Sequence, residues 1–488
     1  MTSPRPSTIV VGTGLAGLTT TLQLLQHGHP VTLLEKTDRL GGNSIKASSG
    51  INGVPTVFQD KNSKDTVEAF IDDTLKSGKG LSNLELVQIL ATNSRGAIDW
   101  LTNSDELNID LSSITQLGGH SYPRTHRGSG KLPPGFAIIS ALTKRLDKYA
   151  EDPSTGLKVI KNAKLDKLLL NSDTKVQGIE YVGENNSRVV LKSDNVVLAT
   201  GGISADFETG SLIKKYRPDL LHLPSTNGKQ TTGDGQKIAE RDVSANLIHM
   251  DQIQVHPTGF IKLDSTTDKW KFLCGELIRG IGGILLSPKT GNRFTNELNT
   301  RDLVTNAIMD NCEVSKNNDL GIAPSSAVSV IVINLDDYLK AKDHIDFYAS
   351  QKLLQRGGVS DLLGLLKRVN SELGLTVEQL VSNLQSYNAA IKNNQDALGR
   401  TKFGAKFNTD DEFFFGLTTP VLHFSMGGIE INKDGQVVTR DNKVVENLYA
   451  VGEVSGGLHG GNRLGGSSLL ECVVFGKIVG DSIRNKAP

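Results

Sequence analysis

Cysteine is scarce in this sequence. Only three cysteines occur among 488 residues, at Cys274, Cys312 and Cys472, and none of them forms a CxxC or CxxCH motif. This scarcity excludes a disulfide framework, an attached c-type haem and an iron–sulfur cluster bound by cysteines. We therefore expect no metal site in this chain.

The sequence also lacks an excess of charge of either sign. Lysine and arginine together number 53, aspartate and glutamate together also number 53, and the formal net charge is zero. A surface that neutralises phosphates normally shows as a basic excess, so we expect no nucleic-acid partner.

Long apolar segments are absent as well. No apolar run approaches the ~18 residues that a membrane-spanning helix needs, and residues 1–8 contain no apolar signal region. The segment Lys486-Ala487-Pro488 matches no peroxisomal or endoplasmic-reticulum signal. We therefore predict a soluble protein with no membrane partner. The expected location is cytoplasmic, with a mitochondrial location as the weaker alternative.

Glycine, in contrast, is abundant, and its first cluster has a characteristic context. The 51 glycines are about 10% of the chain, against a typical ~7%. A strand pattern at 8–11 precedes Gly-Thr-Gly-Leu-Ala-Gly at 12–17, and a helical pattern and a second strand then lead to Glu35. In such a βαβ unit Gly12 permits a tight turn, Gly14 lets the backbone approach a pyrophosphate, and Gly17 lets the helix pack on the strand. We predict a bound dinucleotide with Glu35 on its ribose hydroxyls, and the alternative for Glu35 is a solvated strand end.

Two further features favour FAD over NAD. Gly41-Gly42 follow the second strand, and Val451-Gly452-Glu453 end a much later strand pattern. Both features are similar to those of FAD-binding flavoproteins, whose extended cofactor reaches from the N-terminal βαβ unit to a C-terminal strand. Glu453 is expected to accept a hydrogen bond from a ribityl hydroxyl. Residues 465–469 are expected to place a helix N-terminus at the flavin pyrimidine edge, where N–H groups stabilise the negative charge of the reduced flavin.

The order of these patterns predicts the fold. Strand patterns at 195–199 and 447–451 belong with the N-terminal unit, whereas residues from about 251 to 423 combine a strand at 328–333 with helices near 336–341, 362–373 and 377–391. We therefore predict an α/β protein with a Rossmann-like FAD-binding domain that is split in sequence, and an inserted α+β capping domain. The expected boundaries are 1–250 and 424–488 for the FAD-binding domain and 251–423 for the capping domain, which binds substrate. Ser82-x-x-Glu85 predicts a capping box at a helix start.

Five short motifs indicate a family. In chain order they are Gln254-Val255-His256-Pro257-Thr258, Glu276-Leu277-Ile278-Arg279-Gly280, Asn299-Thr300-Arg301-Asp302, His423-Phe424-Ser425-Met426-Gly427-Gly428 and Gly461-Asn462-Arg463-Leu464-Gly465-Gly466. Together and in this order they resemble the fumarate reductase/succinate dehydrogenase flavoprotein superfamily, and the resemblance covers nearly the whole chain. Gly118-Gly119-His120, Arg124-Thr125-His126-Arg127 and residues 43–50 make the sequence most similar to the soluble fungal fumarate reductases.

The resemblance implies an FAD-dependent oxidoreductase that acts on CH–CH bonds and reduces fumarate to succinate by hydride transfer from flavin N5. It implies that His256, His423 and Arg463 bind and polarise the two carboxylates. It also implies that Arg301 delivers the proton to the other alkene carbon, and that Glu276 and Arg279 relay protons from solvent. The alternative for Arg301 is a purely electrostatic clamp, because an arginine has a pKa above ~12.

Motif positions also imply a larger set of FAD-binding residues. Relatives in membrane-bound complexes attach FAD covalently through a histidine in an Arg-Ser-His-Thr-like segment, where this chain has Asn43-Ser44-Ile45-Lys46. We therefore predict non-covalent FAD. The expected FAD-binding residues are Gly12, Gly14, Leu15, Ala16, Gly17, Glu35, Lys36, Gly42, Asn43, Ser44, Ser48, Ser49, Gly50, Ile51, Thr200, Gly201, Gly202, Asp234, Glu453, Arg463, Gly466, Ser467, Ser468 and Leu469.

The electron donor and the detailed substrate preference stay open at this point. Without haem or cluster motifs, and with one dinucleotide fold, we expect electrons from a diffusible reduced carrier such as free FMNH2 or FADH2. Many relatives have threonine where this chain has Gly275, which leaves the substrate preference open. The alternatives are a flavin enzyme for another activated alkene or ketone (urocanate reductase, aspartate oxidase, ketosteroid dehydrogenase) and a non-catalytic flavin electron-transfer subunit.

Overall fold

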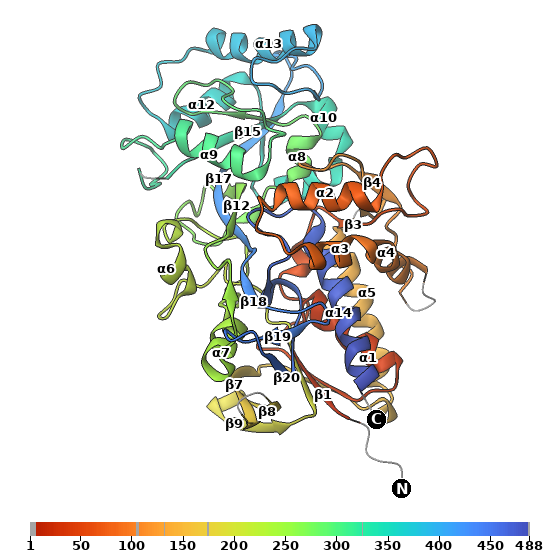
Figure 1. The fold of residues 1–488 in the computed structure, drawn as a ribbon. Helices are drawn as coiled ribbons and strands as arrows, with labels where there is room; N and C mark the ends of the chain where they lie inside the picture. The colour runs from red at the N-terminus through yellow and green to blue at the C-terminus, as the bar shows by residue number, and fades with distance from the viewer. Residues whose placement is uncertain (1–5, 104–106, 131, 173–174, 325, 487–488) are drawn as a thin grey trace. The chain divides into compact units, whose positions relative to one another are not determined.

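The computed structural model describes residues 6–103, 107–130, 132–172, 175–324 and 326–486 (Figure 1). The chain forms two compact units. Unit 1 comprises 1–218, 227–253 and 424–488, and unit 2 comprises 219–226 and 254–423. These units differ from the predicted domains in two short segments, since 219–226 belong to unit 2 and 251–253 to unit 1. The domain boundaries themselves stay a prediction.

A nine-stranded sheet forms the centre of unit 1. Its strands lie in the order β6-β2-β1-β10-β20-β8-β7, with β19 paired to β20 and β9 to β8. Neighbours from β6 to β8 are parallel, whereas β7, β8 and β9 pair antiparallel. All residues of β1 and β10 are buried, which explains their continuous apolar sequences. The bounds are β1 Thr8–Val11, β2 Val31–Leu34, β6 Leu157–Ile160, β7 Lys164–Ser172, β8 Lys175–Val182, β9 Arg188–Lys192, β10 Asn195–Leu198, β19 Gln436–Val438 and β20 Val444–Ala450.

Helices α1 and α14 of unit 1 lie side by side (Figure 1). Glycine permits their close approach, because a Cβ atom on Gly476 would lie 3.0 Å from Cβ of Thr19. The predicted helix after Gly17 begins earlier than expected, at Leu15. The helices of unit 1 are α1 Leu15–Gln26, α2 Val67–Ser77, α3 Leu84–Thr92, α4 Ser94–Asn103, α5 Pro134–Ala150, α6 Leu212–Tyr216, α7 Asp234–Val243 and α14 Ser467–Lys486.

The start of α3 corrects one prediction. The N-cap is Asn83, whose side-chain oxygen accepts hydrogen bonds from the backbone N of Glu85 at 3.0 Å and of Leu86 at 3.4 Å. The predicted capping box at Ser82 is therefore wrong, because Asn83 satisfies the first helical donors one residue later.

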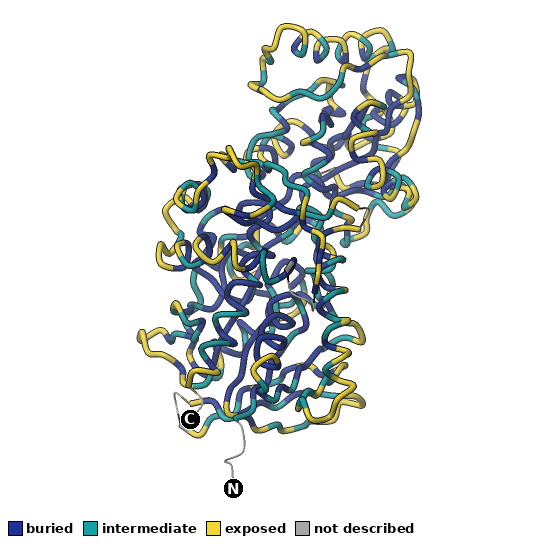
Figure 2. Tube along the Cα trace, turned by 90° about the vertical axis from the view of Figure 1, so that its right-hand side faces the viewer, coloured by how far each residue is buried: buried dark blue, intermediate teal, exposed yellow. Residues whose placement is uncertain are grey.

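The described residues of unit 1 also form two small sheets. One has the order β3-β5-β4, with β3 Ile51–Asn52, β4 Ser113–Thr115 and β5 Thr125–Arg127. The other has the order β11-β18-β21, with β11 Leu247–Ile248, β18 Gly428–Glu430 and β21 Ser455–Gly456. Figure 2 shows buried segments inside each unit, with exposed residues in the surface turns.

Unit 2 contains a six-stranded sheet in the order β13-β12-β17-β15-β14, with β16 paired to β17. Leucines of α12 and α13 join Val330 and Val332 of β15 in one buried cluster, as expected from helices with one apolar face. The strands are β12 Ile253–Ile261, β13 Phe272–Leu273, β14 Ile284–Leu286, β15 Ser329–Ile333, β16 Gln355–Gly357 and β17 Phe413–Ser425. The helices are α8 Glu276–Gly280, α9 Arg301–Asn311, α10 Leu335–Lys340, α11 Lys342–Ser350, α12 Val359–Val369 and α13 Val377–Asn393. Of the helices in the described part of the chain, none has the length and apolar character to cross a membrane.

Candidate active site

The turn between β1 and α1 requires glycine at two positions. Gly12 has φ +108°, and a Cβ atom there would lie 2.3 Å from the Ala199 carbonyl oxygen. A Cβ atom on Gly17 would lie 1.9 Å from the Gly12 carbonyl oxygen. At Gly14, by contrast, the nearest atom would be the Ser44 hydroxyl at 3.6 Å. The turn is thus tightly packed on the sheet side and open at Gly14, which suits the approach of a pyrophosphate.

Glu35 at the end of β2 is buried and fully engaged within the protein. Its carboxylate accepts hydrogen bonds from the Thr13 hydroxyl, from Thr13 N at 3.3 Å, and from Thr37 N and Oγ1, both at 2.9 Å. These four donors occupy the usual acceptor sites of a carboxylate. Glu35 therefore fixes the glycine turn, and its contact with ribose stays a prediction.

The loop after β2 is tied to the segment before α7. Lys36 Nζ lies 2.9 Å from Asp234 Oδ2 and 3.0 Å from Thr232 Oγ1. Burial raises the pKa of Asp234, but the Lys36 charge and hydrogen bond outweigh it and lower that pKa overall. Asn43 donates to Thr231 Oγ1 at 2.7 Å and accepts from Gly228 N at 2.8 Å. Predicted FAD-binding residues from both segments are thereby brought together.

Unpartnered polar atoms accompany these segments. The hydroxyls of Ser48 and Thr200 are buried and have no hydrogen-bond partner among the described residues. Gly201 has φ +78°, and no atom lies within 4 Å of the position of a Cβ on it. Open glycines and unpartnered hydroxyls are the features expected where an extended polar cofactor lies against backbone. The predicted FAD residues of unit 1 thus fit the group.

The second group of predicted FAD-binding residues lies at Glu453 and at the start of α14. Glu453 Oε1 accepts from Ser425 N at 2.9 Å and from Ser425 Oγ at 3.1 Å. Burial raises the pKa of Glu453 to about 7, against the opposing effects of Ser425 and Arg463. Arg463 is buried, with its guanidinium 4.2 Å from the ring centroid of Phe424. Gly466 directly precedes α14, and Ser467, Ser468 and Leu469 are the first residues of that helix.

In unit 2 the structure brings together five predicted catalytic residues, His256 (β12), Glu276 and Arg279 (α8), Arg301 (α9) and His423 (β17). Arg301 lies between two acceptors. Its Nη2 is 2.9 Å and its Nε 3.0 Å from Glu276 Oε2, and its Nη1 is 2.8 Å from Gln254 Oε1. The sixth predicted residue, Arg463, belongs to unit 1.

His256 presents a buried donor. Its Nδ1 accepts a hydrogen bond from Thr258 N at 3.2 Å, so the proton of the neutral ring is on Nε2. That Nε2 is buried and has no partner among the described residues. Burial, together with the charges of Arg301, His423 and Arg279, lowers the pKa of His256 well below its ordinary value. The ring is therefore a neutral N–H donor in a strongly cationic environment.

Arg279 is a buried cation with donors to spare. Its Nη1 donates to the Glu297 carbonyl at 2.6 Å, while Nε and Nη2 have no partner among the residues that the structure describes. Burial lowers the pKa of Arg279, Glu276 opposes that effect, and Arg301 adds to it. Unpaired cationic donors next to a neutral N–H donor are suited to a small anion such as a carboxylate.

Several supporting residues were not predicted. Gln254 accepts from Arg301, and the Thr226 hydroxyl lies 2.8 Å from His423 Nδ1. Arg400 donates to the Arg279 carbonyl at 3.1 Å and to Glu297 Oε2 at 2.9 Å. Gln254 is part of a motif quoted above and could have been found there. Thr226 and Arg400 carry no signal in the sequence, since only the fold brings them to their partners.

The chain is similar to several known proteins. The profile of the FAD binding domain family matches residues 7–469. "Fumarate reductase 1" of Saccharomyces cerevisiae is 45% identical over 98% of both chains, and "Fumarate reductase" of Schizosaccharomyces pombe is 37% identical over 98% of this chain and 89% of that protein. "NADH:fumarate oxidoreductase" of Klebsiella pneumoniae is 33% identical, but this chain spans only 48% of its length. Among solved structures, the open conformation of a flavocytochrome c3 fumarate reductase has a TM-score of 0.77 at 31% identity, covering 99% of this chain and 78% of that one.

These matches confirm three predictions. The fold is a Rossmann-like α/β FAD-binding fold with a capping domain, the cofactor is FAD, and the protein is an FAD-dependent oxidoreductase. The roles of the individual site residues stay predictions.

Proposed function

This chain belongs to the FAD binding domain family and, through its relatives, to the fumarate reductase/succinate dehydrogenase flavoproteins, and from that premise we propose that it reduces fumarate to succinate. The observation that carries the proposal is the cluster of unit 2. There a neutral, buried His256 N–H without a partner among the described residues lies in the field of Arg279 and Arg301. Such donors stabilise the two carboxylates of a small dianion. They also stabilise the negative charge that develops on one carboxylate during reduction.

In this proposal His256 and His423 bind the carboxylates of the substrate. Polarisation of one carboxylate makes the distant alkene carbon electrophilic, and FAD, when bound and reduced, would be the source of the hydride that this carbon accepts. The residues of this chain bind the substrate, exclude water and supply the proton, so that one hydride and one proton convert fumarate to succinate.

Arg301 is proposed as the proton donor to the other alkene carbon. Glu276 and Gln254 hold its guanidinium from two sides, which fixes the direction of its N–H bonds. Glu276 replaces the proton, and Arg279, on the same helix, continues the relay toward solvent. The alternative is that Arg301 acts only as an electrostatic clamp. The kinetics of an Arg301 variant distinguish the two roles.

The FAD is proposed to be non-covalent. The segment at 43–46 contains no histidine, cysteine or tyrosine that would form the bond, and Asn43 and Ser44 are engaged in hydrogen bonds within the protein. Acid denaturation followed by centrifugation should leave all flavin in the supernatant. Flavin that stays with the precipitated protein would overturn this part of the proposal.

The electron donor is proposed to be a diffusible reduced carrier such as free FMNH2 or FADH2. The sequence offers one dinucleotide fold, and the Klebsiella relative that is named for NADH is about twice as long as the matched region. Rapid turnover of fumarate with NADH alone would contradict this donor. The cytoplasmic location is likewise a proposal, which cell fractionation tests.

A substrate panel tests the proposed reaction. Steady-state oxidation of reduced methyl viologen should be fast with fumarate and at least about a hundredfold slower with urocanate or oxaloacetate, because both lack the two-carboxylate alkene that the cations fit. Preference for urocanate would favour the related reductase. A bound flavin that no alkene in the panel reoxidises would favour a non-catalytic electron-transfer protein.

A further inference from the structure

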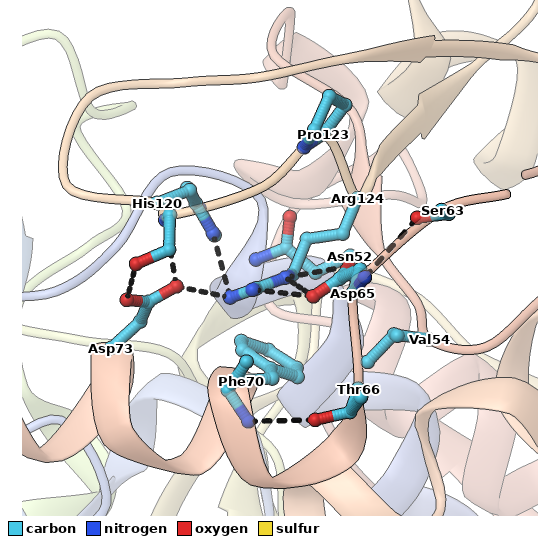
Figure 3. A network of polar contacts seen from close by, with 12 residues as sticks. Asn52, Val54, Ser63, Asp65, Thr66, Phe70, Asp73, His120, Pro123 and Arg124 are labelled. Carbon is cyan, nitrogen blue, oxygen red and sulfur yellow. Dashed lines mark hydrogen bonds and ion pairs between the residues drawn. The ribbon is translucent and has the colours of Figure 1, made fainter.

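A buried polar network of unit 1 is not used by the proposed function. Figure 3 shows Arg124, immediately before β5, between Asp65 and Asp73, with His120 beside it. Arg124 Nη2 lies 2.6 Å from Asp65 Oδ1, and Nη1 lies 2.6 Å from Asp73 Oδ2. The side chain of Arg124 is fully buried, and the ring of Phe70 covers it at 4.9 Å from the guanidinium carbon. This ion-paired cluster holds Arg124 in one orientation.

Arg124 determines which nitrogen of His120 carries a proton. Arg124 Nη1 lies 3.4 Å from His120 Nδ1, and a guanidinium can only donate, so Nδ1 accepts. His120 Nε2 lies 3.0 Å from the Gly465 carbonyl oxygen, and a carbonyl can only accept, so Nε2 carries the proton. The network thus makes His120 a neutral donor aimed at Gly465.

A second donor grips the same carbonyl. Asn52 Nδ2 lies 2.9 Å from Gly465 O and 3.0 Å from Ser467 Oγ. Asn52 is itself fixed by the Thr125 hydroxyl, which donates to Asn52 Oδ1 at 2.6 Å. Asn52 N also donates to the Gly466 carbonyl at 3.3 Å. The Gly465 carbonyl therefore has a defined direction, set by two side chains from distant parts of the sequence.

The direction of that carbonyl fixes the direction of the next N–H group. In a trans peptide the C=O of Gly465 and the N–H of Gly466 point to opposite sides. Gly466 has φ +81°, and a Cβ atom on it would lie 2.3 Å from Asn52 Oδ1, so the conformation is reserved for glycine. The Gly466 N–H consequently points away from His120 and Asn52.

We propose that His120 is a positioning residue for the flavin: by holding the Gly465 carbonyl it aims the Gly466 N–H at the pyrimidine edge of bound FAD. An N–H donor at that edge stabilises the negative charge of the reduced ring and thereby favours reduction. Arg124 acts one step further away, by keeping His120 in the donor tautomer. This inference rests on the proposed function, which requires bound FAD, and on the expectation from the sequence that residues 465–469 lie at the flavin pyrimidine edge; its test needs no fumarate.

The test is the equilibrium constant for two-electron reduction of the bound flavin, measured anaerobically against a dye of known potential. His120→Leu should lower that constant about tenfold, the effect of one lost hydrogen bond. His120→Gln keeps an N–H donor and should stay within about threefold of wild type. The matched control is His126→Leu, because His126 is also buried and bonds to carbonyls of Gly53 and Leu111 rather than Gly465.

Each outcome decides the inference. An unchanged constant in flavin-bearing His120→Leu, or an equal drop in His126→Leu, would overturn it. Where His120→Leu does not fold, Asn52→Ala removes the other donor to the same carbonyl and should lower the constant comparably, and no change would overturn the proposal. A protein whose flavin shows these shifts but ignores fumarate would refute the proposed function and leave this inference standing.

Discussion

The two units bury arginine in opposite ways. In unit 1 each of the three side-chain nitrogens of Arg124 donates a hydrogen bond to a carboxylate, either that of Asp65 or that of Asp73. In unit 2 Arg279 is equally buried, yet its Nε and Nη2 have no hydrogen-bond partner among the described residues. A buried charge without partners is costly, and a protein keeps it where a ligand completes the set. The comparison separates a cation whose donors the protein satisfies from one whose donors are left for the chemistry of the candidate site.

The largest expected effect concerns Arg301. Arg301→Lys keeps the positive charge but loses the guanidinium held by Glu276 and Gln254, so turnover should fall roughly 10³-fold while KM changes little. Steady-state kinetics with reduced viologen measures both constants. Arg356→Lys, on the exposed surface of the same unit, should match wild type. A large rise in KM with modest loss of kcat would instead identify Arg301 as a clamp.

Removal of Arg124 should have its largest effect on stability. Arg124→Met leaves two buried carboxylates without their cation, so the free energy of unfolding should fall by about 3 kcal/mol or more. Denaturant unfolding of the holoenzyme measures the change. The control, Arg188→Met, removes an exposed arginine that pairs with Asp166 and Glu180, and it should lower stability far less than Arg124→Met. Equal losses in the free energy of unfolding for the two variants would contradict the structural role of Arg124.

Arg279→Gln should show the reverse pattern. Turnover should fall about 10²-fold because the relay is interrupted. The free energy of unfolding should change by less than about 1 kcal/mol, since two of the three lost donors had no protein partner. The same unfolding and kinetic assays apply. A loss of stability as large as that of Arg124→Met would mean that Arg279 is structural.

The smallest expected effect is a pH dependence from Glu453. Its pKa is about 7 in the folded protein, above the ordinary value near 4.3, so the folded state keeps a proton that the unfolded chain releases. Stability should therefore fall as pH rises from about 4.5 to 7. Glu453→Gln should remove that slope, by about 1–3 kcal/mol between the two ends. Identical slopes for the variant and the wild type would contradict the raised pKa.

The sequence predicted more of the fold than of the contacts. The glycine turn at Gly12 and Gly17 follows from spacing, because strand, turn and helix are adjacent in the chain. The Asn83 cap was missed by one residue, since Ser82 and Asn83 are both good caps and only geometry chooses between them. Thr226 and His423 are 197 residues apart, and only the pairing of their segments brings them together.

The same limit applied to the candidate site. Motifs named His256, Glu276, Arg279, Arg301 and His423, and the structure places them in one unit. Which donors of that set are satisfied is decided by neighbours such as Glu297, whose carbonyl accepts from Arg279 and which no motif indicated. The unsatisfied donors carry the chemical argument, and they are visible only in three dimensions.

The most direct test is a single turnover without any electron donor. Anaerobically reduced protein is mixed with fumarate in a stopped-flow instrument, and the absorbance of oxidised flavin near 450 nm is followed. We predict full reoxidation within seconds, one succinate formed per flavin, and loss of this phase in His256→Leu. A flavin that stays reduced in the presence of excess fumarate would contradict the account.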